Sequence, residues 1–114
     1  MNSFDYLLIA HLLGDFLFQT KWMADKKVTL WLPLIIHSFI YTAIIWLISY
    51  YAFGGLSLTG FILIFSGHII LDRRVVVNLW ASKIMRMDDS DPVWIKVAID
   101  QIFHIILLAI SLHL

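Results

Sequence analysis

Three histidine–aspartate pairs lie inside strongly apolar segments of this chain, and the two members of each pair are four residues apart. The pairs are His11 with Asp15, His68 with Asp72, and Asp100 with His104. A spacing of four places both side chains on one face of an α-helix. A carboxylate near the centre of a membrane-spanning helix costs about 2.5–3.5 kcal/mol. These carboxylates must therefore be paired, hydrated or bound to a ligand.

The composition predicts an integral membrane protein with the lipid bilayer as its partner. The 114 residues are 61% hydrophobic and 14% charged, whereas soluble domains are about half apolar and a quarter charged. Eight basic and eight acidic residues give no net charge, so nothing favours a nucleic-acid partner. The chain has no cysteine, which excludes a disulfide framework, a thiol nucleophile and thiolate-bound zinc.

Four apolar segments account for nearly the whole chain. They cover residues 4–22, 31–53, 56–72 and 93–113, and each is close to the ~20 residues that a membrane-spanning helix needs. We therefore predict an all-α, polytopic membrane protein in which residues 1–114 form one bundle of four transmembrane helices. Residues 1–6 carry no basic residue and Asp15 interrupts the first apolar segment, so we expect this segment to be retained rather than cleaved as a signal peptide.

The basic residues predict an orientation. Lysines and arginines gather in the first and third connections, while the Gly54-Gly55 turn and both ends of the chain have none. The positive-inside rule then places both termini outside the cytoplasm. Within residues 73–87, Val76, Leu79, Trp80 and Ile84 recur at helical spacing among basic residues. This pattern fits either a short amphipathic helix on the membrane surface or an extension of the third span.

Every predicted span places a histidine or an aspartate in its cytoplasmic half, with His37 as the contribution of the second span. Imidazole and carboxylate groups directed inward from several helices are typical of metal sites in helix bundles. Seven side chains are candidate ligands of a divalent metal, with zinc as the expected ion: His11, Asp15, His37, His68, Asp72, Asp100 and His104. Because seven exceeds what one tetrahedral zinc ion uses, one or two ions are expected.

The same segments carry recognisable motifs. The first span contains HLLGDFLFQ, the third GHIILDR and the fourth DQIFH, and the second contains the single His37. Together they resemble a small bacterial and phage family of integral membrane proteins known only as a domain of unknown function. This resemblance implies a location in the inner membrane. The histidine–aspartate pairs are also loosely similar to those of membrane-bound metal-dependent hydrolases.

The first functional hypothesis is an intramembrane metal-dependent hydrolase. A divalent ion would activate water, and Asp15 or Asp100 would act as general base if it is not a ligand. Four further polar residues flank the candidate ligands and are predicted to bind substrate: Gln19, Arg73, Arg74 and Gln101. The paired arginines favour a phosphate or another anionic headgroup, so we expect a lipid-linked phosphoester or amide as substrate.

Two alternatives remain open at this point. The polar residues could serve a proton-coupled or divalent-cation transporter, which with four short spans would require a homo-oligomer or a partner subunit. The apolar runs Ile44 to Ile48 and Ile106 to Ile110 argue against this reading, because they leave the outer half without polar groups. The other alternative is a structural or regulatory membrane protein in which the His/Asp core only stabilises the bundle.

Overall fold

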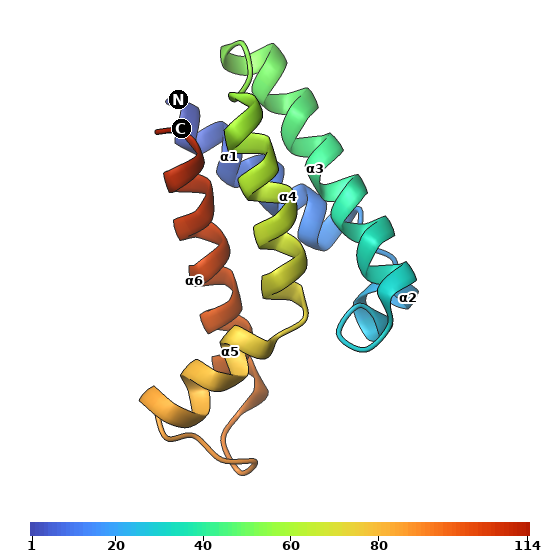
Figure 1. The fold of residues 1–114 in the computed structure, drawn as a ribbon, viewed down its shortest axis with the longest axis vertical. Coiled ribbons are helices and arrows are strands. Elements are labelled where there is room, and N and C mark those ends of the chain that lie inside the picture. The colour runs from blue at the N-terminus through green and yellow to red at the C-terminus, as the bar shows by residue number, and fades with distance from the viewer.

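The computed structural model describes residues 1–114 and contains helices and turns without a β-strand, as predicted (Figure 1). In chain order the elements are α1 (Ser3–Leu12), the π-helical turn η1 (Leu13–Leu17), α2 (Lys21–Lys26), α3 (Trp31–Phe53), α4 (Leu58–Asp72), α5 (Val75–Leu79), the π-helical turn η2 (Trp80–Ile84) and α6 (Val93–Ser111).

The longer helices pack into a bundle. Helix α4 packs against α3 and α6, and α1 packs against α3 and α6. Both termini lie at one end of the bundle, beside the turn between α3 and α4 (Figure 1). Helices α2 and α5 lie toward the opposite end, where the basic connections are found (Figure 1).

Local sequence signals explain most helix boundaries. Asn2 and Asp5 form a reciprocal capping box at the start of α1, which satisfies two free backbone donors. Ser57 caps α4 by accepting a hydrogen bond from the Gly60 amide at 3.0 Å. Gly54 ends α3 with a φ of 87°, a left-handed conformation that glycine adopts at little cost.

The prediction of four transmembrane helices is not met. Only α3, with 23 residues, and α6, with 19, are long and apolar enough to cross a bilayer. The predicted first span breaks after η1, because Thr20 caps a separate helix, α2. Helix α4 has 15 residues, which gives a rise of about 22 Å against a hydrocarbon thickness of ~30 Å.

The segment after α4 does not extend that helix. The chain turns at Arg74, whose φ is 65°, and continues as the short helix α5 and the turn η2, which project from the bundle (Figure 1). Val77 and Ala81 are buried in a small cluster with Ile99 of α6, while Leu79 and Trp80 are exposed. The predicted amphipathic segment thus forms one short helix, Val75–Ile84, whose second half is π-helical.

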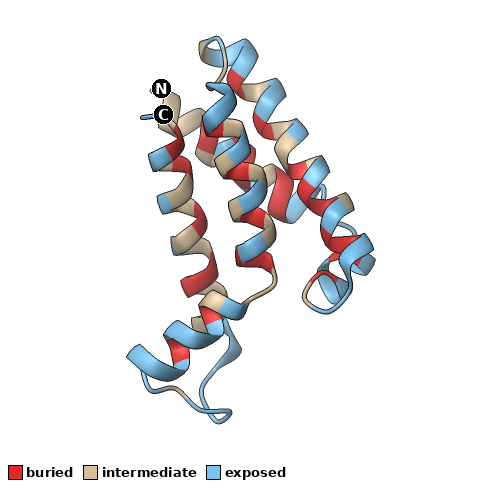
Figure 2. Cartoon of the chain, viewed as in Figure 1, coloured by how far each residue is buried: buried red, intermediate tan, exposed pale blue.

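The interior of the bundle is unusually polar and its exterior unusually apolar. Six buried side chains form the apolar cluster: Leu7, Ala10, Tyr41, Ile45, Ile64 and Leu108. Nearly as many polar as apolar side chains are buried, and thirty large hydrophobic side chains are exposed. Buried positions form stripes along the inward faces of α3, α4 and α6 (Figure 2).

Candidate metal centre

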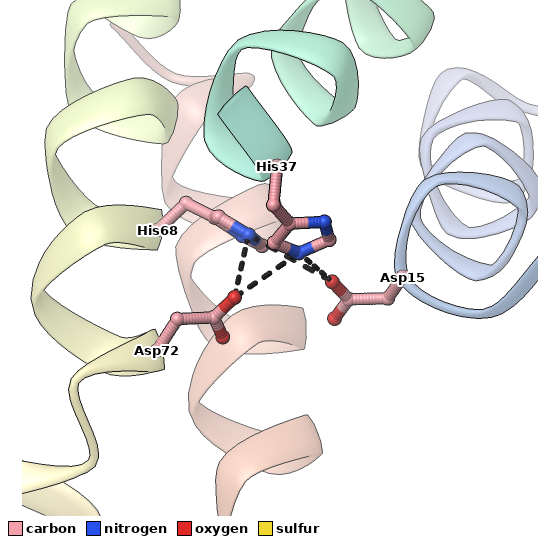
Figure 3. A group of neighbouring side chains, drawn as sticks. All are labelled: Asp15, His37, His68 and Asp72. Atoms are coloured by element: carbon pink, nitrogen blue, oxygen red, sulfur yellow. Dashed lines mark hydrogen bonds and ion pairs between the residues drawn. The ribbon is translucent and has the colours of Figure 1, made fainter. Parts of the chain in front are cut away.

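All seven predicted ligands are buried, each with at most 3% of its surface exposed. We call them the polar centre: His11 from α1, Asp15 from η1, His37 from α3, His68 and Asp72 from α4, and Asp100 and His104 from α6. The i, i+4 spacing on α4 and α6 directs both members of each pair inward. Four of the seven side chains converge from three separate elements in Figure 3.

Asp15 reaches the centre from an irregular part of the first helix. The Phe18 amide donates to the Leu13 carbonyl at 2.9 Å across the π-helical turn, and such turns often occur at functional sites. Gly14 permits the close approach of this turn to α3, because a Cβ there would lie 2.8 Å from Cδ2 of Tyr41. The Gln19 side chain donates to the Asp15 carbonyl oxygen at 2.8 Å.

Asp15, His37, His68 and Asp72 form a four-donor group whose ligand atoms all lie within 4.8 Å of one another. His37 Nε2 is 3.0 Å from Asp15 Oδ1 and 3.1 Å from Asp72 Oδ2. His68 Nε2 is 2.9 Å from Asp72 Oδ2 and 3.7 Å from Asp15 Oδ1 (Figure 3). Ligands about 2.0–2.1 Å from a tetrahedral ion are about 3.3 Å apart, so these separations fit the edges of one coordination tetrahedron.

Most of these short contacts are not hydrogen bonds. His68 Nε2 and both carboxylate oxygens of Asp72 are buried without a hydrogen-bond partner, as is Nδ1 of both His37 and His68. A buried polar atom without a partner costs about 1–3 kcal/mol. The donor atoms of these four side chains lie close together, and the group could hold a metal ion.

Asp72 also belongs to a second group, formed with Asp100 and His104. His104 Nε2 lies 3.3 Å from Asp72 Oδ1 and has no hydrogen-bond partner. The other ring nitrogen, Nδ1, is 2.7 Å from the Asp100 carbonyl oxygen. A histidine held in this way through Nδ1 presents Nε2 as a free base or ligand.

His11 lies outside both groups. Its Nδ1 is 2.7 Å from the Tyr41 hydroxyl, and its Nε2 is 2.7 Å from Gln101 Oε1. With both ring nitrogens engaged, His11 orients its neighbours in this structure. Its role as a ligand stays a prediction. Tyr41, which the sequence analysis did not select, also stacks on the His68 ring with the centroids 4.0 Å apart.

A buried lysine joins the centre. Lys27, only 6% exposed, places its Nζ 3.1 Å from Asp72 Oδ2. In the sequence it is one of three lysines in the first connection, and no spacing rule separates it from the others. Lys21 instead pairs with Asp25 on the surface at 2.6 Å, and this hydrogen bond raises the pKa of Lys21.

The four predicted substrate-binding residues are half-buried and border the polar centre or its basic end: Gln19, Arg73, Arg74 and Gln101. The Gln101 amide donates weakly to Asp100 and Asp15, at 3.3 and 3.5 Å. Arg73 donates to the Val28 carbonyl and lies over the Trp31 ring. Three surface pockets are lined almost wholly by apolar residues and include no residue of the polar centre.

The sequence matches, over residues 4–114, the family described as "Protein of unknown function (DUF3307)", and the chain belongs to that family. This agrees with the predicted membership of a family of unknown function. No curated protein and no solved structure matches the chain. The family match adds no activity, so the functional argument rests on the residues of the polar centre.

Proposed function

We propose that this member of the DUF3307 family is a membrane protein whose polar centre binds a divalent metal ion, with zinc as the expected ion. The observation that carries this proposal is the four-donor group of Asp15, His37, His68 and Asp72. Its short separations of 2.9–3.7 Å fit a tetrahedral ion. Several of its buried donor atoms have no hydrogen-bond partner. We further propose that the ion serves hydrolysis of a lipid-linked phosphoester or amide.

The reversed distribution of polarity supports a membrane location. A soluble monomer rarely exposes large contiguous apolar patches, whereas this bundle exposes thirty large hydrophobic side chains and buries charged ones. In our proposal α3 and α6 cross the bilayer, and the shorter α1 and α4 pack beside them. The polar centre then lies inside the bundle, where intramembrane ionisable residues are expected to face.

The proposed orientation places both termini outside the cytoplasm, in the inner membrane. The termini lie at the end of the bundle opposite α2 and α5 (Figure 1). Most lysines and arginines occur in or next to α2 and α5, and basic residues favour the cytoplasmic side. Reporter fusions after Leu114 and within residues 82–89 should localise to opposite sides of the membrane. Two cytoplasmic reporters would contradict this topology.

The hydrolase proposal rests on the residues beside the four-donor group. A bound divalent ion supplies an activated water nucleophile at neutral pH, and catalytic zinc accommodates a fifth ligand. His104 Nε2 and Asp100 Oδ1 lie next to that group without hydrogen-bond partners, which suits a proton acceptor. Arg73 and Arg74 would hold an anionic headgroup at the cytoplasmic end.

Metal content tests the first part of the proposal. Protein purified in detergent without chelator should carry zinc or another divalent ion, and His68→Ala should lose it because His68 supplies a central ligand atom. The matched control is His113→Ala, since His113 is exposed and lies near the end of the chain. Wild-type protein that takes up no divalent ion from a saturating solution would refute the metal site.

Catalysis is tested with a panel of lipid phosphates and N-acylated lipids in mixed micelles. Asp100→Asn should lose hydrolysis while keeping the ion and the fold, because a general base is neutralised without removing the four-donor group. Asp15→Asn should instead lower both metal content and hydrolysis. If the metal-loaded wild type hydrolyses no member of the panel, the hydrolase proposal fails and the metal site stands alone.

A structural role is the second candidate, and one observation favours it. The four-donor group supplies a complete set of protein ligands from three elements, and each is nearly inaccessible, as in structural zinc sites. Parallel loss of metal and thermal stability in every ligand variant, with no variant separating hydrolysis from metal, would favour this role. Transport has less support because the apolar cluster lies beside the centre in the bundle interior.

A further inference from the structure

Lys27 is the one lysine buried in the bundle, and it contacts the carboxylate that the two ligand groups share. Its Nζ lies 3.1 Å from Asp72 Oδ2, and both side chains are nearly inaccessible, at 8% and 1% exposed. Of the two Asp72 oxygens, Oδ2 faces His37 and His68, while Oδ1 faces His104. The ammonium group therefore lies against the carboxylate that two metal ions would have to share.

The position of Lys27 is fixed by its neighbours. Arg73, which follows Asp72, donates from Nη1 to the carbonyl of Val28, which follows Lys27, at 2.8 Å. The Arg73 guanidinium also lies 3.9 Å from the centre of the Trp31 ring, an arrangement stabilised by cation–π attraction. These contacts fasten the connection between α2 and α3 to the end of α4. Lys27 is thereby held at Asp72.

The charges of the centre indicate what the ammonium group does. Asp15, Asp72 and Asp100 bring three negative charges into the bundle interior, where an unbalanced charge is costly. One divalent ion and one ammonium group together carry the three positive charges that balance them. Two divalent ions in addition to Lys27 would leave an excess of positive charge.

We propose that Lys27 supplies the positive charge that a second metal ion would otherwise bring, so that the polar centre holds one divalent ion per chain. The ion occupies the four-donor group, and the second group, in which Asp72 is joined by Asp100 and His104, holds no ion of its own. This inference rests on the proposed metal site. It adds the number of ions bound per chain and attributes that number to the charge of Lys27. The cation that completes the centre is supplied by the chain itself.

The test is the zinc content of full-length protein in detergent after saturation with zinc and removal of free metal. We expect one ion per chain in the wild type and two in Lys27→Gln, because the amide leaves Asp72 free to bridge two ions. Lys26→Gln is the matched control, since Lys26 is the exposed neighbour, and it should stay at one. Adding His104→Ala to Lys27→Gln should return the content to one.

The charge of Lys27 is tested separately with two further variants. Lys27→Met should also bind two ions, whereas Lys27→Arg should keep one because it retains the positive charge. Two ions in the wild type or in Lys27→Arg would overturn the inference while leaving the metal site intact. So would a single ion in both Lys27→Gln and Lys27→Met. No bound zinc in the saturated wild type would instead refute the proposed metal site itself.

Discussion

The apolar cluster and the polar centre are neighbours in one bundle and are equally buried, yet their buried side chains need different kinds of contact. Ile45, Ile64 and Leu108 of the apolar cluster have at most 1% exposure and need only close packing. In the polar centre, atoms of His68, Asp72 and His104 are equally buried without hydrogen-bond partners. The comparison teaches that the first region holds the helices together by packing, whereas the second gathers donor atoms that could hold a metal ion.

The largest expected effect separates the two regions by their response to zinc. With free zinc about 1,000-fold above its dissociation constant, bound metal stabilises the folded protein by about 4 kcal/mol. We expect His37→Ala to lose both the ion and this stabilisation, because His37 contacts both carboxylates of the four-donor group. Unfolding by denaturant in detergent, with zinc and with chelator, measures the difference. An unchanged zinc response in His37→Ala would contradict the proposed ligand set.

A smaller effect is expected from the apolar cluster. Ile64→Ala should lower the free energy of unfolding by about 3 kcal/mol, since it leaves a cavity in a fully packed region. The increment of stability produced by zinc should remain as in the wild type, because Ile64 contributes no donor atom. The same denaturation series checks both statements, with exposed Ile62→Ala as the control. Loss of the zinc response in Ile64→Ala would show that the two regions are not independent.

The four-residue spacing of histidine and aspartate was enough to predict which helix faces point into the bundle. The His68–Asp72 and Asp100–His104 pairs lie within α-helices, so a four-residue spacing predicts that both members of each pair point the same way. The structure brings six of the seven predicted ligands into two adjoining groups. Four equal spans were not obtained, because a hydrophobicity count does not register that Thr20 caps a new helix or that Arg74 adopts a left-handed turn.

The remaining features depend on tertiary structure. Lys27 and Tyr41 enter the centre through contacts with residues far away in the chain, Asp72 and His11. No local pattern distinguishes Lys27 from Lys26, whose side chain is exposed. The π-helical turn at Asp15 likewise cannot be predicted from the spacing of residues. In the structure, Gly14 of this turn packs closely against Tyr41.

The smallest expected effect lies at the boundary of the two regions, at Tyr41. Its ring packs within the apolar cluster and against His68, while its hydroxyl lies 2.7 Å from His11 Nδ1. Tyr41→Phe keeps the ring and removes the hydroxyl, so we expect a loss of roughly 1–2 kcal/mol from the hydrogen bond and the unpaired His11 nitrogen. Zinc content should stay at one ion per chain, because His11 lies outside both ligand groups. Elemental analysis of Tyr41→Phe beside the exposed control Tyr50→Phe decides the matter. A fall in zinc content in Tyr41→Phe alone would mean that His11 takes part in metal binding and that the polar centre extends into the apolar cluster.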